Sequence, residues 1–164
     1  MNKYNLLNLL LMISIAWLSI SSCEKKDPVI DQIDMSAALM NKKWVLITQT
    51  REPAVDLDAD GTPDQDVYAH RADCMKDDFI VFKEQEVFEG NAGVIKCYEE
   101  PQTTMATWVL DAKNAKVSVT DAAKNVKTWE ILELSNTLLK VKYVWATGYN
   151  QNITLTDVLT FEAR

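Results

Sequence analysis

Two segments near the carboxyl end alternate apolar and polar residues so regularly that they restrict the chain to a β fold. Residues 139–145 carry apolar side chains at every second position with lysines between them, and residues 153–161 repeat the pattern with threonines. A period of two sends alternate side chains to opposite faces of a strand, so each segment has one apolar face. Asp157 falls on the apolar face of the second segment, where its charge needs a partner.

Seven further segments have strand character and are separated by turn residues. They are residues 44–50, 79–83, 86–89, 94–98, 105–110, 116–120 and 128–134. A helical pattern is confined to residues 31–41, where Asp31 or Asp34 would be the N-cap. Because no connection holds a crossover helix, strands adjacent in sequence are expected to pair antiparallel. The expected fold class is all-β: an antiparallel up-and-down meander barrel of about eight strands with one short N-terminal helix.

The first 22 residues differ from the rest of the chain. Lys3 gives a positive start, and residues 6–20 form an apolar run broken only by three polar residues. Such a run is typical of a signal peptide and stops short of the ~20 apolar residues that a transmembrane helix needs. The sequence Ile20-Ser21-Ser22-Cys23 resembles a lipobox, the cleavage motif of bacterial lipoproteins. The resemblance implies that Cys23 becomes the first residue and carries a diacylglycerol thioether and an acyl group such as palmitate. The alternative is an ordinary secretory signal followed by a spare cysteine.

This leader defines the expected organisation: residues 1–22 are a signal peptide, residues 23–34 a lipidated cysteine and tether, and residues 35–164 the barrel domain. Two or three acyl chains anchor a protein stably, so the membrane is an expected partner. The expected location is the cell envelope, on the outer membrane, at its periplasmic face or the cell surface. With Cys23 assigned to lipid, Cys74 and Cys97 remain as an even pair in an oxidising compartment, and we expect a disulfide between them. The alternative is two buried free thiols.

Charge and composition exclude some functions. Of the 17 basic residues Lys3 lies in the leader, whereas all 24 acidic residues follow it, so the mature chain has a net charge of about −8. Nucleic acid, which requires clustered basic residues, is therefore not an expected partner. His70 is the only histidine and is expected on a surface loop, too few soft ligands remain for a common zinc site, and no nucleophilic serine motif is present. We expect no catalytic residues and no enzymatic activity, although paired carboxylates cannot be judged without their separation in space.

An acidic segment, residues 56–66, resembles the calcium loops of EF-hands and thrombospondin-type repeats. Carboxylates at alternate positions followed by a glycine turn can wrap one Ca²⁺ ion with hard oxygen ligands. The ligands expected from the resemblance are Asp56, Asp58, Asp60, Thr62, Asp64 and Asp66. Val67 stands where an EF-hand needs a bidentate glutamate, so the loop would close differently. The alternative is a solvated acidic turn, and no other cofactor is expected.

Several short motifs, taken in order, resemble a family of lipocalin-like bacterial lipoproteins. They are a short helix running into Trp44 within residues 39–46, the acidic loop, residues 74–79, residues 93–97 and the pair Thr107-Trp108. The family usually has glycine where this chain has Lys42, which affects the turn before Trp44. The resemblance implies an eight-stranded barrel in which Trp44 closes one end.

Aromatic residues on inward positions of such a barrel either fill the interior or line a pocket. The ligand-binding candidates are Trp108, Trp129, Tyr143 and Trp145. If they line a pocket, the protein is a non-enzymatic binding module for a small apolar or amphipathic molecule. If the interior is packed, the alternative is an interaction domain that presents loops to a glycan or a protein of the cell envelope. An apolar cavity would favour the first function, and an exposed aromatic patch the second.

Overall fold

The structure is a computed structural model, which describes residues 34–99, 101–147 and 153–164. The expected signal peptide, lipidated Cys23 and tether lie outside these residues, except for Asp34. Among the described residues, no helix combines the length and the apolar character that crossing a membrane requires.

Within the described residues, one α-helix precedes the sheet. Helix α2 (Met35–Leu39) begins after Asp34, whose side chain accepts hydrogen bonds from the backbone N–H groups of Ser36 and Ala37 at 3.0 and 3.3 Å. Asp34 is thus the N-cap, one of the two aspartates that the sequence offered for this function, because the first N–H groups of a helix have no partners within it. Two single-turn 3₁₀ helices, η1 (Asp73–Met75) and η2 (Ala112–Asn114), lie in connections between strands.

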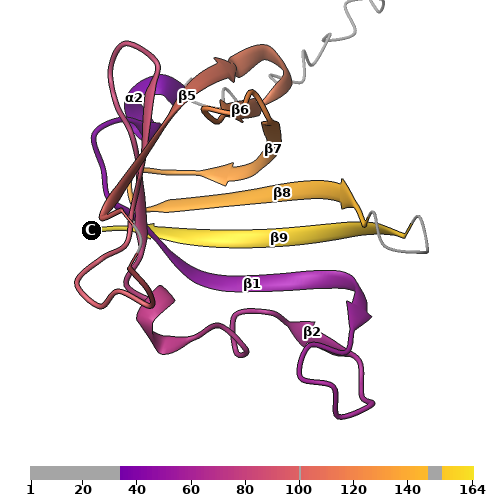
Figure 1. The fold of residues 1–164 in the computed structure, drawn as a ribbon. Helices are drawn as coiled ribbons and strands as arrows, with labels where there is room; N and C mark the ends of the chain where they lie inside the picture. Colours follow the sequence, from indigo (N-terminus) through magenta and orange to yellow (C-terminus); the bar gives the residue numbers. More distant parts are fainter. Residues whose placement is uncertain (1–33, 100, 148–152) are drawn as a thin grey trace, which may run out of the picture. The chain divides into compact units, whose positions relative to one another are not determined.

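Nine strands form the rest of the fold (Figure 1). They are β1 (Trp44–Val55), β2 (Asp64–Asp66), β3 (Phe79–Phe82), β4 (Val87–Asn91), β5 (Thr103–Asp111), β6 (Lys116–Thr120), β7 (Val126–Leu134), β8 (Leu138–Ala146) and β9 (Thr154–Ala163). Each strand from β3 to β9 pairs antiparallel with the next one in sequence, and β9 pairs with β1. Strand β1 also pairs with β3, so eight strands close into an up-and-down barrel, as predicted.

Two parts of the sheet differ from the prediction. Residues 94–98, expected to be a strand, form part of the connection between β4 and β5, so that prediction was wrong. Their backbone amides are held elsewhere: those of Val94 and Ile95 donate to the carboxylate of Asp77. Strand β2 was not predicted, because its residues Asp64–Asp66 have no apolar alternation. It pairs with the distal half of β1, beyond the short contact of β1 with β3.

The predicted alternation sets the core. Leu139 and Val141 on β8 are fully buried, and the opposite residues on β9, Phe161 and Leu159, belong to or pack against the same core. Helix α2 covers one end of this core, because Leu39 is fully buried and its carbonyl accepts a hydrogen bond of 2.8 Å from the indole Nε1 of Trp44. Trp44 is also fully buried, and this hydrogen bond fixes its indole against the helix.

Candidate functional site

The barrel interior contains a cavity of about 460 Å³. Pockets of roughly 300–1,000 Å³ are the size that small-molecule ligands occupy in proteins. Its apolar wall comes from seven of the eight barrel strands, all except β8. The apolar residues are Trp44, Leu46, Phe79, Ile80, Phe88, Met105, Ala106, Val119, Trp129, Leu159 and Phe161. The interior is therefore not completely filled by side chains.

Aromatic rings run in contact from the closed end of the barrel to the cavity wall. At the closed end, Phe82 meets Trp108 edge to face with 5.2 Å between ring centroids. Phe82 also meets Phe88 edge to face at 5.3 Å, and Phe88 meets Trp129 at 6.4 Å. Such arrangements are favoured by the quadrupoles of aromatic rings. Phe82 and Trp108 thus form a packed floor, and Phe88 and Trp129 stand above it in the cavity wall.

Polar residues gather at one part of the cavity lining. They are Arg71, Asp78, Thr104, Asp121, Asn125 and Lys127. Asp121 and Asn125 belong to the turn between β6 and β7, whereas Arg71 and Asp78 flank η1. The lining thus combines a large apolar body with a polar mouth, an arrangement that suits an amphipathic molecule.

The four aromatic candidates from the sequence occupy three different environments. Trp129 lines the cavity and stacks on Phe161 with 6.0 Å between ring centroids. Trp108 is buried in the floor, where its Nε1 donates to the carbonyl of Lys83 at 2.9 Å. Tyr143 and Trp145 are not among the residues that line the cavity. Sequence reasoning did not single out Phe88, Ala106 or Val119, which only strand register brings to the wall.

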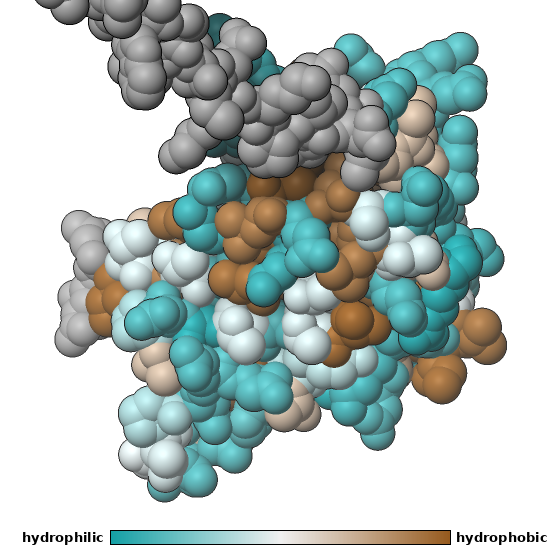
Figure 2. Space-filling model, turned by 180° about the vertical axis from the view of Figure 1, so that it is seen from behind, coloured by the Kyte–Doolittle hydropathy of each residue, from teal (hydrophilic) through white to brown (hydrophobic). Residues whose placement is uncertain are grey.

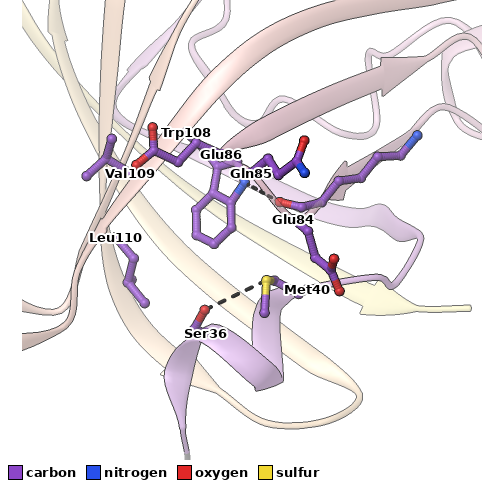
Figure 3. Close-up of a pocket in the computed structure, with 9 residues that line it drawn as sticks. Ser36, Met40, Glu84, Gln85, Glu86, Trp108, Val109 and Leu110 are labelled. Atoms are coloured by element: carbon purple, nitrogen blue, oxygen red, sulfur yellow. Dashed lines mark hydrogen bonds between the residues drawn. The ribbon is translucent and has the colours of Figure 1, made fainter.

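A second, smaller pocket of about 320 Å³ lies beside Trp108, one of the two residues of the cavity floor (Figure 3). It is bounded by α2, the turn between β3 and β4, and the end of β5, with the ring of Trp108 between them. Ser36 and Met40 contact each other across its base, with 3.8 Å between Oγ and Sδ. Glu84 and Glu86 also line it. Its wall is shallow and mixed in polarity, so the main cavity is the stronger candidate for an apolar ligand.

A charged pair lies inside the barrel where β1 meets β9. Arg51 Nε and Nη2 donate to the two oxygens of Asp157 at 2.7 and 2.8 Å, and Gln49 Nε2 donates to Oδ2 at 2.9 Å. The Asp157 side chain is 5% exposed and that of Arg51 14%. The hydrogen bonds that Arg51 donates to Asp157 raise the pKa of Arg51 above its ordinary value. The expectation that Asp157 needs a partner is therefore confirmed, and the pair fills part of the interior beside Trp145, whose ring centroid is 5.1 Å from the guanidinium carbon.

The acidic loop brings together three of the six residues expected to bind calcium. Carboxylate oxygens of Asp56, Asp58 and Asp64 lie within 4.8 Å of one another. The carboxylate of Asp60 instead accepts from the N–H of Thr62 at 2.7 Å. The carboxylate of Asp66 accepts from the N–H of Ala69 at 3.0 Å.

All three clustered aspartates also make contacts in and next to the loop. The carboxylate of Asp58 accepts from the N–H of Asp60 at 3.2 Å. Asp64 Oδ1 lies 3.1 Å from His70 Nε2, and its Oδ2 accepts from the N–H of Leu57 at 2.9 Å. The carboxylate of Asp56 accepts from the N–H of Gly61 at 2.9 Å. These contacts hold the loop together, so a cation would compete with them for the oxygens.

The disulfide predicted from the cysteine count is present: Cys74 and Cys97 are bonded, 23 residues apart in sequence. It ties η1 to the connection between β4 and β5. Asp77 makes a second link, because its Oδ2 accepts from the N–H groups of Val94 and Ile95 at 2.6 and 3.1 Å, and the hydrogen bond from Val94 lowers the pKa of Asp77. Only glycine fits at residue 93 beside this link. A Cβ there would lie 2.5 Å from the carboxyl carbon of Asp77, and the φ of +63° is one that other residues rarely adopt.

This braced connection, residues 92–99, exposes apolar side chains. Val94 is 93% exposed, Tyr98 73% and Ile95 57%. Other large apolar residues with substantial exposure are Met105, Val109, Val126, Leu132, Val144 and Ile153. Figure 2 shows apolar side chains gathered in patches between polar ones on one face of the protein. Large exposed apolar patches are typical of interaction sites.

Comparison with known proteins yields one structural similarity. No protein-family model matches the chain, and no curated protein matches it in sequence. A solved structure, a deswapped triple mutant of bovine odorant-binding protein, is similar over 76% of this chain and 73% of that chain. The identity is 11% and the TM-score 0.42, so the barrel assignment is based on the strand pairing described above.

The fold and the cavity define a lipocalin-like class: a small up-and-down barrel of eight antiparallel strands with one short helix and an internal apolar cavity.

Proposed function

We propose that this protein is a non-enzymatic binding module that holds a small apolar or amphipathic molecule inside its barrel. The cavity of about 460 Å³ with its continuous apolar wall carries this proposal. Removing apolar surface from water contributes roughly 25 cal/mol per Å², and a cavity that already exists requires little reorganisation when a ligand enters. The packed floor of Phe82 and Trp108 supplies a rigid base for such a ligand.

The experiment is a native mass spectrum of the full chain purified from its own cells, in which a bound small molecule appears as added mass. Ala106→Trp places a large ring into the cavity from the β5 wall and should abolish the added mass. Thr107→Trp is the matched control, because the neighbouring residue points to the opposite face of the same strand. Equal added mass in both variants, or none in the wild type even after exposure to apolar ligands, would contradict the proposal.

The proposal includes lipid anchoring through Cys23 at the cell envelope. It is supported by the lipobox-like sequence of residues 20–23 and by the disulfide between Cys74 and Cys97, since such bonds persist in oxidising compartments. Radiolabelled fatty acid should enter the wild-type protein and not Cys23→Ala, while Cys74→Ala keeps the label. Equal labelling of wild type and Cys23→Ala would refute the anchor.

A second candidate function is docking of an envelope protein or glycan on the exposed connection between β4 and β5. The exposure of Val94, Ile95 and Tyr98 on a segment braced by a disulfide favours it. A photoactivatable cross-linker at position 94 should then give one discrete adduct in cells. The same cross-linker at Thr120, on the outer surface of β6, is the control, and identical adduct patterns would count against docking.

For the acidic loop we propose weak calcium binding by Asp56, Asp58 and Asp64 as a structural support. A ligand that binds only the folded state raises its midpoint of thermal unfolding. Millimolar Ca²⁺ should therefore raise the midpoint of the wild type over that in chelator, and Asp58→Asn should reduce the shift. If Ca²⁺ leaves the unfolding midpoint of the wild type unchanged, calcium binding is excluded and the loop is a solvated acidic turn.

A further inference from the structure

We infer that the natural ligand of the cavity is an amphiphile with a negatively charged head group, which binds at Lys127 while its apolar body lies among the inner side chains. The inference depends on the proposed binding function and specifies its ligand class. It is based on the position of one cation at the cavity mouth.

Strand pairing places Lys127 on the inner face of the barrel. Lys127 lies directly opposite Val119 in the pairing of β7 with β6, and Val119 is 8% exposed and lines the cavity. Trp129, two residues further along β7, also lines the cavity, and residues two apart on a strand share one face. Lys127 itself is exposed and belongs to the lining, so its side chain joins the apolar wall to solvent.

The other charged groups of the mouth are already engaged. Arg71 donates from Nε to the carbonyl of Met75 at 2.9 Å and lies 3.3 Å from Asp78 through Nη2. Asp121 accepts from the side-chain and backbone nitrogens of Asn125 at 3.0 and 2.9 Å, and these hydrogen bonds lower its pKa.

Lys127 differs from these groups. Within residues 34–99, 101–147 and 153–164 its ammonium makes no hydrogen bond or ion pair, although its charge contributes to the lowered pKa of Asp121. It is therefore the cation of the lining that is available to a ligand.

Physical chemistry then selects the ligand class. A charged head group cannot enter the apolar interior without a large desolvation cost, so it must stay at the mouth. At the mouth, an anionic head group can bind the ammonium of Lys127, which remains in contact with water. The apolar stem of this lysine extends the apolar wall of the cavity. The whole chain is acidic, with a net charge of −7, so long-range attraction does not favour anions and the local cation must supply it. A cationic head group would gain no such contact with Lys127.

The test compares three probes with the same chain length and different heads: dodecanoate, dodecanol and dodecyltrimethylammonium. The full chain is placed in phosphatidylcholine nanodiscs, and binding of each radiolabelled probe is measured by equilibrium dialysis, with empty nanodiscs subtracted. Dodecanoate should bind more tightly than dodecanol, and dodecyltrimethylammonium least. Lys127→Gln should weaken dodecanoate about three- to tenfold, the range expected for one partly exposed charge-assisted hydrogen bond, and leave dodecanol unchanged.

Two variants serve as controls. Lys127→Arg keeps the charge and should restore dodecanoate binding and its weakening by salt. Lys116→Gln removes an equal charge from an outward position on β6 and should change neither probe.

The outcomes separate the two proposals. If dodecanoate and dodecanol bind equally, or if Lys127→Gln changes both alike, the head-group inference is overturned and the binding function stands. The same holds if dodecyltrimethylammonium binds best. If no probe binds above empty nanodiscs, or if Ala106→Trp binds all of them as the wild type does, the binding function itself fails and the inference fails with it.

Discussion

Arg51 and Asp157 face each other as partners across the contact of β1 with β9 that closes the barrel, with 2.7 Å between Nε and Oδ1. The first and last strands therefore meet through both backbone pairing and a nearly buried ion pair. Gln49 supplies a further hydrogen bond to the same carboxylate. The contact joins residues 106 positions apart in sequence.

Removing one member of this pair should destabilise the protein strongly. Arg51→Ala leaves the carboxylate of Asp157 in the interior with only Gln49 as a donor, and we expect a loss of about 2–4 kcal/mol in the free energy of unfolding. Urea unfolding of the full chain measures it. Glu162→Gln breaks the exposed pair with Arg164 and should cost less than about 1 kcal/mol. Similar losses for both variants would contradict the special role of the inner pair.

Two tryptophans provide a matched comparison of indole hydrogen bonds. Trp44→Phe removes the donor to the buried carbonyl of Leu39 and should cost about 1–3 kcal/mol in addition to the lost ring area. The Nε1 of Trp145 is shielded from solvent and has no hydrogen-bond partner in the described part of the chain. Trp145→Phe should therefore be much milder in thermal unfolding, because it removes an unsatisfied polar group. A larger loss of stability for Trp145→Phe than for Trp44→Phe would show that ring packing, not the indole hydrogen bond, determines the effect.

The lowered pKa of Asp77 predicts an acid-sensitive connection between β4 and β5. The hydrogen bonds of the folded protein favour the ionised form of Asp77. Its contribution to the stability of the folded state is therefore present above the ordinary aspartate pKa and is lost as the pH falls through the lowered pKa. The amide chemical shifts of Val94 and Ile95 should titrate together, with a midpoint below the ordinary value of about 3.9. Asp77→Asn should abolish this titration. A midpoint at or above the ordinary value would contradict the hydrogen bonds.

The disulfide should stabilise the protein mainly by restricting the unfolded chain. Closing a loop across 23 residues of sequence corresponds to about 3 kcal/mol in the chain-entropy model. The double variant Cys74→Ala/Cys97→Ala should lower the free energy of urea unfolding by about that amount, and adding a reductant should change the wild type but not the variant. A reductant-insensitive wild type would indicate that the bond contributes little.

Sequence alone was sufficient where local pattern and burial agree. Strand β6 was predicted with its observed ends, and β8 and β9 within two residues, because one face of each strand is buried and the period of two reports it. The disulfide and the need of Asp157 for a partner also followed from local chemistry and counting, and the N-cap was narrowed to Asp31 or Asp34.

Only the tertiary structure decided which residues surround the cavity. Trp108 and Trp129 look alike in sequence, yet one fills the floor and the other lines the cavity, because position along the barrel depends on the register between strands. Residues 94–98 are rich in strand-forming residues, but contacts with Asp77 and Cys74 hold them in a loop. Hydrophobic periodicity reports which face of a strand is buried, whereas the partner that buries it is set by long-range closure of the sheet.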